Sequence, residues 1–528
     1  MEKFVSFSSK LWREPTFMVT RVYSATLLGV DALEVEVEVN DTKADEFKIN
    51  IVGLPDKAVR ESLDRVLSAL SNSGLFRSRG RVIVNLAPAD LQKVGNGFDL
   101  PIALAMAANK YIPIEGLETF ASIGELALNG EVRSVRGILP IALEARRKGR
   151  KNLIVPASVA AQASVVAGLN IYGVRDLSEA WDLIRGESKL QPEPCRAAEF
   201  FARTSSYSID FTDVRGQAGV KRAVEVAVAG GHNLLLIGPP GTGKSMIAKR
   251  IATIMPRMTE VEALETTKIH SAAGLLDQNV PFVATRPFRS PHHTVSQPGL
   301  LGGSSPPRPG EVSLAHYGVL FLDELPEFKR DTLEVLRQPL EDGKVTISRA
   351  SGSTTFPASF MLVAAMNPCP CGYHGDARRE CRCSPLIVAR YRERISGPLL
   401  DRIDLHVEVP FVPFQELSSG KPGDGSDLLR IRVEQARDIQ RERFRGNSEV
   451  FTNSAMPPRL VRKHCELDAE ASALLGEAME RETFSARAHD RILKVARTLA
   501  DMAGAEHLAS DHVLEAVQYR SLDRKLWS

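Results

Sequence analysis

One eight-residue segment, Gly238-Pro-Pro-Gly-Thr-Gly-Lys-Ser245, constrains the fold of this chain more than any other feature. It directly follows Asn233–Ile237, an apolar run typical of a buried strand, and it precedes helical spacing over Met246–Ile254. A G-x4-G-K-S spacing between a strand and a helix is the pattern of a phosphate-binding loop. The sequence therefore predicts an α/β domain built around a nucleotide site.

The residue types of this loop suit a triphosphate and its magnesium ion. Small residues let backbone N–H groups surround the β- and γ-phosphates, and the loop enters the positive end of a helix. We expect Lys244 to place a charge on the phosphate oxygens and Ser245 to offer a hydroxyl to Mg²⁺. A flexible Gly-Pro turn is the alternative interpretation, which this context disfavours. The predicted ATP-binding residues of the loop are Gly238, Pro239, Pro240, Gly241, Thr242, Gly243, Lys244 and Ser245.

Two further apolar runs end in polar side chains. Val319–Leu322 is followed by Asp323 and Glu324, and Phe360–Ala365 is followed, after one methionine, by Asn367. We expect Asp323 to hold Mg²⁺ through water and Glu324 to act as the general base. Asn367 is expected to orient the attacking water. Each of these patterns alone is often a turn, but their order after a phosphate-binding loop favours ATP hydrolysis.

Composition excludes several other classes of protein. With 43% hydrophobic and 25% charged residues, the chain is neither disordered nor a small disulfide scaffold. Its 67 basic and 65 acidic residues create no global field that would recruit nucleic acid, so such binding requires a local patch. No apolar run reaches the roughly 18 residues of a membrane span, and the N-terminus lacks a secretory signal. The chain is therefore expected to be cytoplasmic.

Periodicity and composition divide the chain into three domains. Leu33–Val39 alternates apolar and acidic residues like a half-buried strand, whereas prolines near 192 mark a linker. After a Gly/Ser-rich loop, the remaining sequence has helical spacing. The predicted segments are an extension (1–19), an α+β domain (20–185), a linker (186–209), an α/β domain (210–412), a flexible loop (413–427) and a helical domain (428–528).

Four cysteines crowd into the segment 369–383. Cys369, Cys371, Cys381 and Cys383 form two C-x-C pairs, which indicate a metal site rather than disulfides. Four thiolates could close a tetrahedral Zn²⁺ site that clips a loop without its own core. The C-x-C spacing is tighter than the usual one, and His374 could replace one cysteine. Free thiols in a reduced loop are the alternative.

The three strand ends together resemble an AAA+ ATPase, and two further stretches narrow the resemblance. Leu336–Gly343 followed by Val345–Arg349 resembles the magnesium chelatase ATPase subunit and is similar to minichromosome maintenance helicases. Over nearly its whole length the chain resembles the ComM/YifB-type magnesium-chelatase-like ATPases. That resemblance implies an ATP-dependent homohexamer, a helicase that drives branch migration on single-stranded or branched DNA in recombination or natural transformation.

Two other functions remain open. A chelatase-type ATPase would remodel a protein partner during metal insertion, and a nucleotide-gated assembly module would hydrolyse little ATP. Chelatase ATPase subunits lack the N-terminal domain that this chain carries, which favours work on DNA. An intact Glu324 argues against the assembly module.

The resemblance also implies roles for three residues outside the strand ends. Arg402, in Leu399–Asp404, corresponds to an arginine finger that reaches the γ-phosphate of a neighbouring subunit, an arrangement that requires head-to-tail assembly. Arg487, which opens a helix, corresponds to sensor 2 and would touch the phosphates from its own helical lid. Gln217 lies where such ATPases contact adenine. For both arginines, a surface salt bridge is the alternative.

Two loops are candidates for DNA contact under the same resemblance. The Pro/Gly-rich stretch that contains His292 and His293 corresponds to an insert that faces a central pore. The predicted hairpin that follows carries Lys344 and Arg349 as candidate contacts to the DNA backbone. Ordinary solvated loops are the alternative for both. No aromatic-interleaved platform is visible, so sequence-specific recognition of single strands is not expected.

The N-terminal region 20–183 resembles the proteolytic domain of Lon. Gly97 stands where that domain carries its nucleophilic serine, and Leu139 stands at the position of its lysine. Without a hydroxyl and an amine no catalytic dyad can form. This region is therefore expected to be a non-proteolytic scaffold for ring assembly or DNA. Related chains begin near Met18, so residues 1–17 are interpreted as an added tail or a mis-set start.

Overall fold

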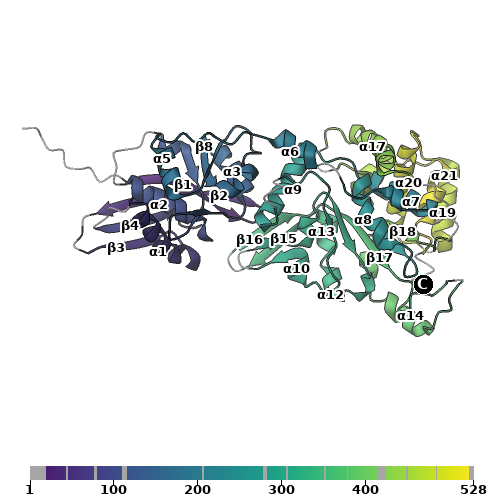
Figure 1. Cartoon of the computed structure of the whole chain (residues 1–528). Coiled ribbons are helices and arrows are strands. Elements are labelled where there is room, and N and C mark those ends of the chain that lie inside the picture. Colours follow the sequence, from purple (N-terminus) through teal and green to yellow (C-terminus); the bar gives the residue numbers. More distant parts are fainter. Residues whose placement is uncertain are drawn as a thin grey trace, which may run out of the picture. The chain divides into compact units, whose positions relative to one another are not determined.

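The computed structural model contains two compact units (Figure 1). The first comprises residues up to 198 together with 271–281, and the second comprises 199–270 and 282 onward. The predicted extension and most of the predicted flexible loop lie outside the described residues. The structure describes residues 19–522, except 43, 45, 76–79, 110–115, 205–206, 277–281, 305–306, 350–351, 377, 414–422, 448–449 and 483.

The first unit is built on a seven-stranded mixed sheet in the order β3-β4-β2-β1-β5-β8-β9. The alternation predicted for Leu33–Val39 is confirmed in β2, because Val35, Val37 and Val39 are buried while their neighbours are more exposed. Asp56 caps α1 by accepting a hydrogen bond from the Val59 N–H. The strands are β1 (Thr20–Leu28), β2 (Asp31–Thr42), β3 (Lys48–Val52), β4 (Arg81–Ala87), β5 (Phe120–Ser122), β8 (Asn152–Pro156) and β9 (Asn170–Val174). The main helices are α1 (Lys57–Asn72), α2 (Asp99–Ala108), α3 (Ile138–Arg147) and α5 (Leu177–Ile184).

The two positions at which the Lon resemblance lacks a dyad are packed into this unit. A Cβ atom on Gly97 would lie 2.8 Å from Cδ1 of Ile123, so the site has no space for a side chain unless Ile123 moves. Leu139 is fully buried at the start of α3. Neither position has room for a polar side chain that reaches solvent.

The second unit contains a five-stranded parallel sheet in the order β11-β14-β17-β10-β18. All residues of β10, β14 and β17 are buried, as expected for parallel strands with both faces covered. Leu234 and Leu236 of β10 join one apolar core, and Leu235 and Ile237 join another on the opposite face. The strands are β10 (Leu234–Ile237), β11 (Phe288–Arg289), β14 (Val319–Leu322), β17 (Met361–Met366) and β18 (Leu405–Glu408).

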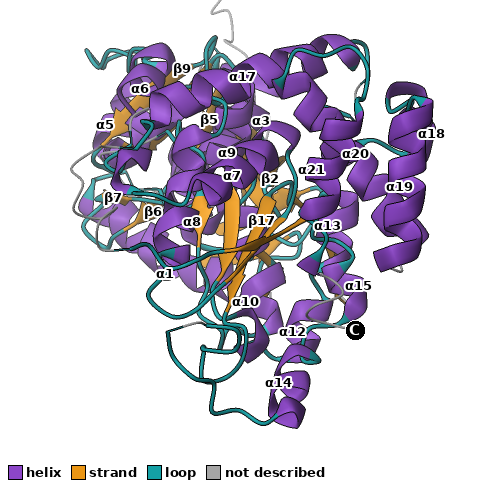
Figure 2. Cartoon of the chain, turned by 90° about the vertical axis from the view of Figure 1, so that its right-hand side faces the viewer, coloured by secondary structure: helices purple, strands orange, loops and turns teal. Residues whose placement is uncertain are grey.

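Helices cover both faces of this sheet (Figure 2). One face packs against α7 (Ala218–Gly230), α8 (Lys244–Ile254) and the C-terminal helices, whereas short helices between β11 and β17 cover the other. The C-terminal helices share the core of the sheet, so they belong to one compact unit with it. They are α17 (Ser426–Arg443), α18 (Pro458–His464), α19 (Ala469–Glu482), α20 (Ala486–Met502) and α21 (Ser510–Gln518).

These five helices agree with the helical spacing of the sequence after the Gly/Ser-rich loop. The shortest of them, α18, has seven residues and begins at a proline. Within the described ranges, every helix is too short or too polar to cross a lipid bilayer.

Candidate functional site

The phosphate-binding loop leaves the carboxyl end of β10 and enters α8 at Lys244. Gly241 and Gly243 have φ angles of 80° and 86°, a left-handed conformation that glycine adopts without steric cost. The predicted strand–loop–helix arrangement is therefore confirmed. It aims the N-terminus of an eleven-residue helix at the space beside the loop, where backbone N–H groups favour an anion.

The side chain of Lys244 is buried against the phosphate-binding loop. Its Nζ donates hydrogen bonds to the carbonyl oxygens of Gly238 at 2.6 Å and Pro239 at 2.8 Å, and to Oδ1 of Asn367 at 3.2 Å. The lysine predicted to bind phosphate and the asparagine predicted to orient the attacking water thus lie in contact. Burial lowers the pKa of Lys244 to about 8, and the nearby Asp323 carboxylate opposes that shift. A bound polyphosphate would raise this pKa again, because its negative charge favours the protonated amine.

The two predicted magnesium ligands also meet. Ser245 Oγ donates a 2.6 Å hydrogen bond to Oδ2 of Asp323, which directly follows β14. The contact arises because β17 lies between β10 and β14, so the carboxyl ends of all three parallel strands reach one edge of the sheet. A hydroxyl and a carboxylate are oxygen donors of the kind that Mg²⁺ prefers.

Glu324 occupies the next position and carries a strained backbone. Its φ angle is 53°, a left-handed conformation that costs a residue with a side chain roughly 1–3 kcal/mol. The carboxylate is more than half exposed, and His293 Nδ1 lies 3.7 Å from its Oε2. Such strain is found where a structure holds a side chain in a required place. Here it turns Glu324 outward from the strand end.

The contact with Glu324 changes the interpretation of the histidine pair. His293 also packs edge-on against Phe328, with ring centroids 6.4 Å apart, and His292 bonds Thr294 through Nδ1 at 2.9 Å. His293 was predicted as a DNA contact, but the structure places it beside the acidic residue of the nucleotide site. No spacing in the sequence indicates this pairing, because it depends on β11 and β14 being neighbours in the sheet.

Gln217 lies against the phosphate-binding loop. Its Nε2 donates to the carbonyl oxygens of Thr242 at 3.0 Å and Pro410 at 2.8 Å. The side chain therefore ties the loop to the segment that follows β18. Gln217 therefore lies beside the candidate nucleotide site. Its amide N–H group donates to protein carbonyl oxygens in this structure.

The structure does not bring Arg402 and Arg487 to the phosphate-binding loop of their own chain. Asn233, which precedes β10, donates from Nδ2 to the Arg402 carbonyl at 2.9 Å, so Arg402 lies where β10 begins. The loop lies where β10 ends, roughly 13 Å away along four residues of strand. Arg402 pairs with Glu341, and Arg487 lies 3.6 Å from Asp401.

The position of Arg487 differs from the one expected for it. The position of Arg402 does not test whether it acts on a neighbouring subunit. Arg487 was expected to touch the phosphates from its own chain, but α20 holds it beside Asp401, at the opposite edge of the sheet. Arg487 makes the surface ion pair of the alternative interpretation, whereas the guanidinium of Arg402 is buried in its ion pair with Glu341. The side chain of Arg487 is 67% exposed, whereas that of Arg402 is 8% exposed. Both arginines therefore lie away from the phosphate-binding loop of their own chain.

A buried polar network lies at the edge of the sheet that carries Arg402. This network was not predicted from the sequence. His232 Nδ1 lies 3.2 Å from Asp404 Oδ2, and its Nε2 lies 2.9 Å from Thr498 Oγ1. Arg491 of α20 also pairs with Asp404. Burial alone would raise the pKa of Asp404, but Arg491 and then His232 lower it below its usual range. The network fastens α20 to the segment that carries Arg402.

The predicted hairpin is confirmed as β15 (Lys344–Arg349) paired antiparallel with β16 (Gly352–Pro357). Lys344 and Arg349 are both exposed and lie at opposite ends of β15. The insert between β11 and β14 lies against this hairpin, since a Cβ on Gly302 would meet Ile347 at 3.0 Å. The hairpin and the part of the insert around Gly302 are therefore in contact.

The four cysteines gather as predicted. Their sulfur atoms all lie within 4.8 Å of one another, and all are free thiols. Among the described residues, His374 is not part of that group. The sequence spacing alone therefore located this cluster, with the four cysteines and not the histidine as its members.

Comparison with known proteins agrees with this architecture. Models of the magnesium chelatase subunit ChlI match residues 35–159 and 210–417, and a model of the C-terminal region of that subunit matches 423–520. The competence protein ComM of Haemophilus influenzae is 42% identical over 510 residues, which cover 96% of this chain and 98% of ComM. The uncharacterized protein YifB of Escherichia coli is 41% identical, with coverage of 96% and 97%. The magnesium-chelatase 38 kDa subunit of Rhodobacter capsulatus is 24% identical over 60% of this chain and 87% of its own length.

Proposed function

Because this chain belongs to the ComM/YifB-type magnesium-chelatase-like proteins, we propose that it is an AAA+ ATPase that forms a ring and moves DNA. One observation carries the ATPase part of the proposal. Lys244, Asn367 and the Ser245–Asp323 pair converge at a single edge of the parallel sheet, next to Glu324. These groups supply a cation that binds phosphate, an amide that positions water, ligands for magnesium and a general base.

At this edge each group has a distinct task. The loop N–H groups and Lys244 bind the phosphates of ATP, while Ser245 and Asp323 hold Mg²⁺, which neutralises charge on the phosphate oxygens. Glu324 accepts a proton from the attacking water, and Asn367 orients that water through its amide. When the phosphates bind, before water attacks, Lys244 exchanges its contacts with the Gly238 and Pro239 carbonyls for phosphate oxygens.

The site is completed by a second copy of the chain. Arg402 and Arg487 lie at the edge of the sheet opposite the phosphate-binding loop. A head-to-tail interface would present that edge of one copy to the loop of the next, and repeated contacts of this kind close into a ring. We propose a hexamer, as the family resemblance implies. Arg402 leaves Glu341 and binds the γ-phosphate in the site of the neighbouring copy. Arg487 contacts the phosphates in that same site.

The DNA part of the proposal rests on the surface made by the hairpin and the insert. Lys344 and Arg349 offer exposed cations on an otherwise nearly neutral chain. A relative that matches over almost the whole chain is named as a competence protein. We propose that the ring drives branch migration or unwinding of DNA in recombination or natural transformation. The N-terminal unit would then serve as a Lon-like scaffold without proteolytic activity.

A chelatase-type ATPase that acts on a protein partner is the second candidate, and the matches to magnesium chelatase subunits favour it. ATP hydrolysis measured with single-stranded, forked and duplex DNA separates the two. Work on DNA predicts that single-stranded or forked DNA raises the rate, with an affinity that falls steeply as salt increases. If no DNA changes the rate while a partner protein does, the second candidate replaces the first.

A further inference from the structure

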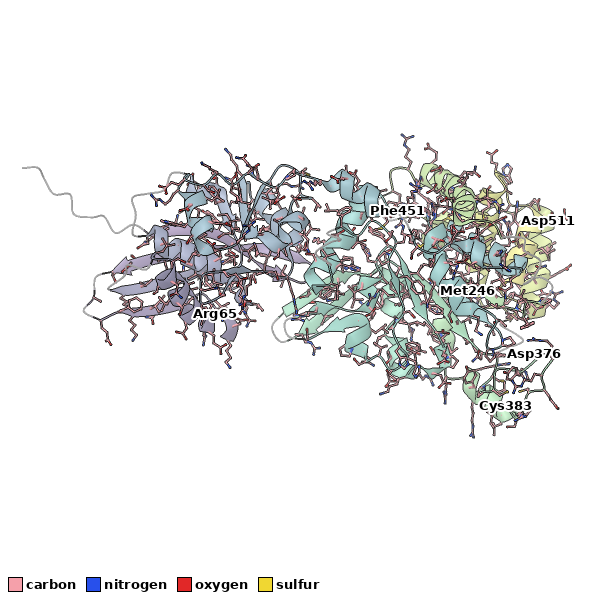
Figure 3. All side chains as sticks on the ribbon, viewed as in Figure 1. Arg65, Met246, Asp376, Cys383, Phe451 and Asp511 are labelled. Carbon is pink, nitrogen blue, oxygen red and sulfur yellow. The ribbon has the colours of Figure 1, made fainter. Side chains whose placement is uncertain are left out.

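The loop that follows Asn367 brings four thiols together. We infer that Cys369, Cys371, Cys381 and Cys383 bind one structural Zn²⁺ ion, and that this ion holds Asn367 and the phosphate-binding loop in register. Zinc binding stands on the cysteine geometry alone, whereas its effect on catalysis rests on the proposed ATPase function. The segment lies next to α14 (Pro385–Arg392), where Figure 3 labels Cys383 and Asp376.

The sulfur positions fit a tetrahedral metal. Cys369 Sγ lies 3.3 Å from Cys371 Sγ and 3.7 Å from Cys381 Sγ, and the latter two are 3.6 Å apart. Four ligands at a Zn–S distance of about 2.3 Å place their sulfurs about 3.8 Å from one another. A donor set of four thiolates selects zinc over magnesium or calcium, which prefer oxygen.

The loop has little else to hold it. No helix or strand is formed among the described residues between β17 and α14, and of the four cysteines only Cys369 is buried. A metal can stabilise such a segment in place of an apolar core. Zinc with four thiolates carries a formal charge of about −2. Arginines that can offset this charge crowd the same stretch: Arg378, Arg379, Arg382, Arg390, Arg392 and Arg394.

Two contacts connect the thiol cluster to the nucleotide site. Cys369 follows Asn367 by two residues, and Arg392 of α14 donates from Nε to the intervening Pro368 carbonyl at 3.2 Å. On the other side, Gly372 lies against Pro240 of the phosphate-binding loop. A Cβ on Gly372 would come within 2.5 Å of Pro240 Cδ, and the φ of Gly372 is 85°.

The geometry therefore gives the metal a positioning role. The zinc-held loop touches the phosphate-binding loop at Pro240 and continues from the strand end that presents Asn367 to Lys244. Removal of the ion frees both ends of this bridge. ATP binding through the helix N-terminus would persist, but the orientation of Asn367 would be lost. We therefore expect kcat to fall more than KM for ATP rises.

Metal analysis of the full-length protein tests the site itself. The protein, purified under reducing conditions without chelators, is expected to contain about one zinc per chain. A Cys381→Ser/Cys383→Ser variant should lose it, whereas Cys195→Ser, which alters an exposed cysteine outside the cluster, should retain it. A wild-type protein that neither contains zinc nor takes it up after reduction would overturn the inference. This readout is independent of ATPase activity.

Kinetics tests the positioning role. Zinc is removed from the wild-type protein with a chelator and then restored, and kcat and KM for ATP are compared at each stage. Loss of a supporting metal shell is expected to lower kcat roughly tenfold or more, with recovery on addition of zinc. An unchanged kcat in metal-free protein would refute the positioning role but keep the metal site. A zinc-loaded protein without any ATPase activity would refute the proposed function instead.

Discussion

His293 Nδ1 lies 3.7 Å from Oε2 of Glu324, so the insert after β11 contacts the acidic residue that follows β14. The same insert packs against the β15–β16 hairpin, through Gly302 and Ile347. A DNA molecule on that surface could therefore influence the proposed base through a single side chain. The pair offers a physical connection between the proposed DNA surface and the proposed catalytic residue Glu324.

Removal of the His293 imidazole should disturb the position of Glu324 without affecting the phosphate-binding loop. We expect His293→Ala to lower kcat for ATP roughly 3- to 10-fold with little change in KM. His292→Ala is the matched control, because His292 bonds Thr294 and not Glu324. Steady-state ATPase assays without DNA measure both. Equal effects of the two substitutions would show that the contact between His293 and Glu324 has no separate role.

Glu324→Gln removes the carboxylate that accepts the proton and keeps the size of the side chain. Turnover should fall by about 10²- to 10⁴-fold, while ATP still binds because Lys244 and Ser245 are untouched. Rapid-filtration binding of labelled ATP, run beside a single-turnover assay, measures the two properties separately. Normal turnover in this variant would remove Glu324 from the mechanism.

The buried Lys244 predicts that ATP binding takes up protons. Burial lowers the pKa of the free amine to about 8, and bound phosphates raise it, so the bound state carries more protons above pH 8. ATP affinity should therefore fall as the pH increases from about 8 towards 9.5. Titration calorimetry at pH 8.5 in two buffers of different ionisation enthalpy measures the uptake, which should be about three quarters of a proton per site, because roughly a quarter of the free amines already carry a proton at that pH. Zero uptake would contradict the environment described for Lys244.

The network around Asp404 should contribute strongly to stability. Asp404→Asn leaves Arg491 without its buried anionic partner, and removal of one member of such a pair costs about 3–5 kcal/mol. Because the pKa of Asp404 is lowered in the fold, its contribution is present above the unfolded pKa and is lost as the pH falls through the folded value.

Asp427→Asn is the control, since that exposed carboxylate pairs with Arg430 at the surface and should cost less than about 1 kcal/mol. Thermal unfolding at pH 7 compares the two variants. Similar melting temperatures for both variants would indicate that the Asp404 network contributes no more to stability than a surface ion pair.

Local patterns in the sequence were sufficient for the nucleotide site. The runs before Gly238, Asp323 and Asn367 are short and wholly apolar, so each predicts a buried parallel strand with a polar end. In the structure, the order of these strands in the sheet brings their three polar ends together. The cysteine cluster was predictable for the same reason, because its four members lie within one short segment.

Contacts between distant segments could not be predicted in this way. Arg487 opens a predicted helix, but only the packing of α20 against Asp404 determines which edge of the sheet it reaches. The contact of His293 with Glu324 likewise depends on the pairing of β11 with β14. One clue was available, since Arg402 comes three residues before the first residue of β18 and therefore lies near the end at which the parallel strands begin.

A mixing experiment tests most directly whether adjacent copies share each site. Lys244→Ala and Arg402→Ala are expected to be inactive alone, the first because it cannot hold ATP productively and the second because its neighbours lack a finger. In a random equal mixture, roughly a quarter of the interfaces join an intact Lys244 to an intact Arg402, so roughly a quarter of wild-type ATPase activity should return. A mixture that forms rings yet stays inactive, or an Arg402→Ala variant with the wild-type rate, would contradict the shared site.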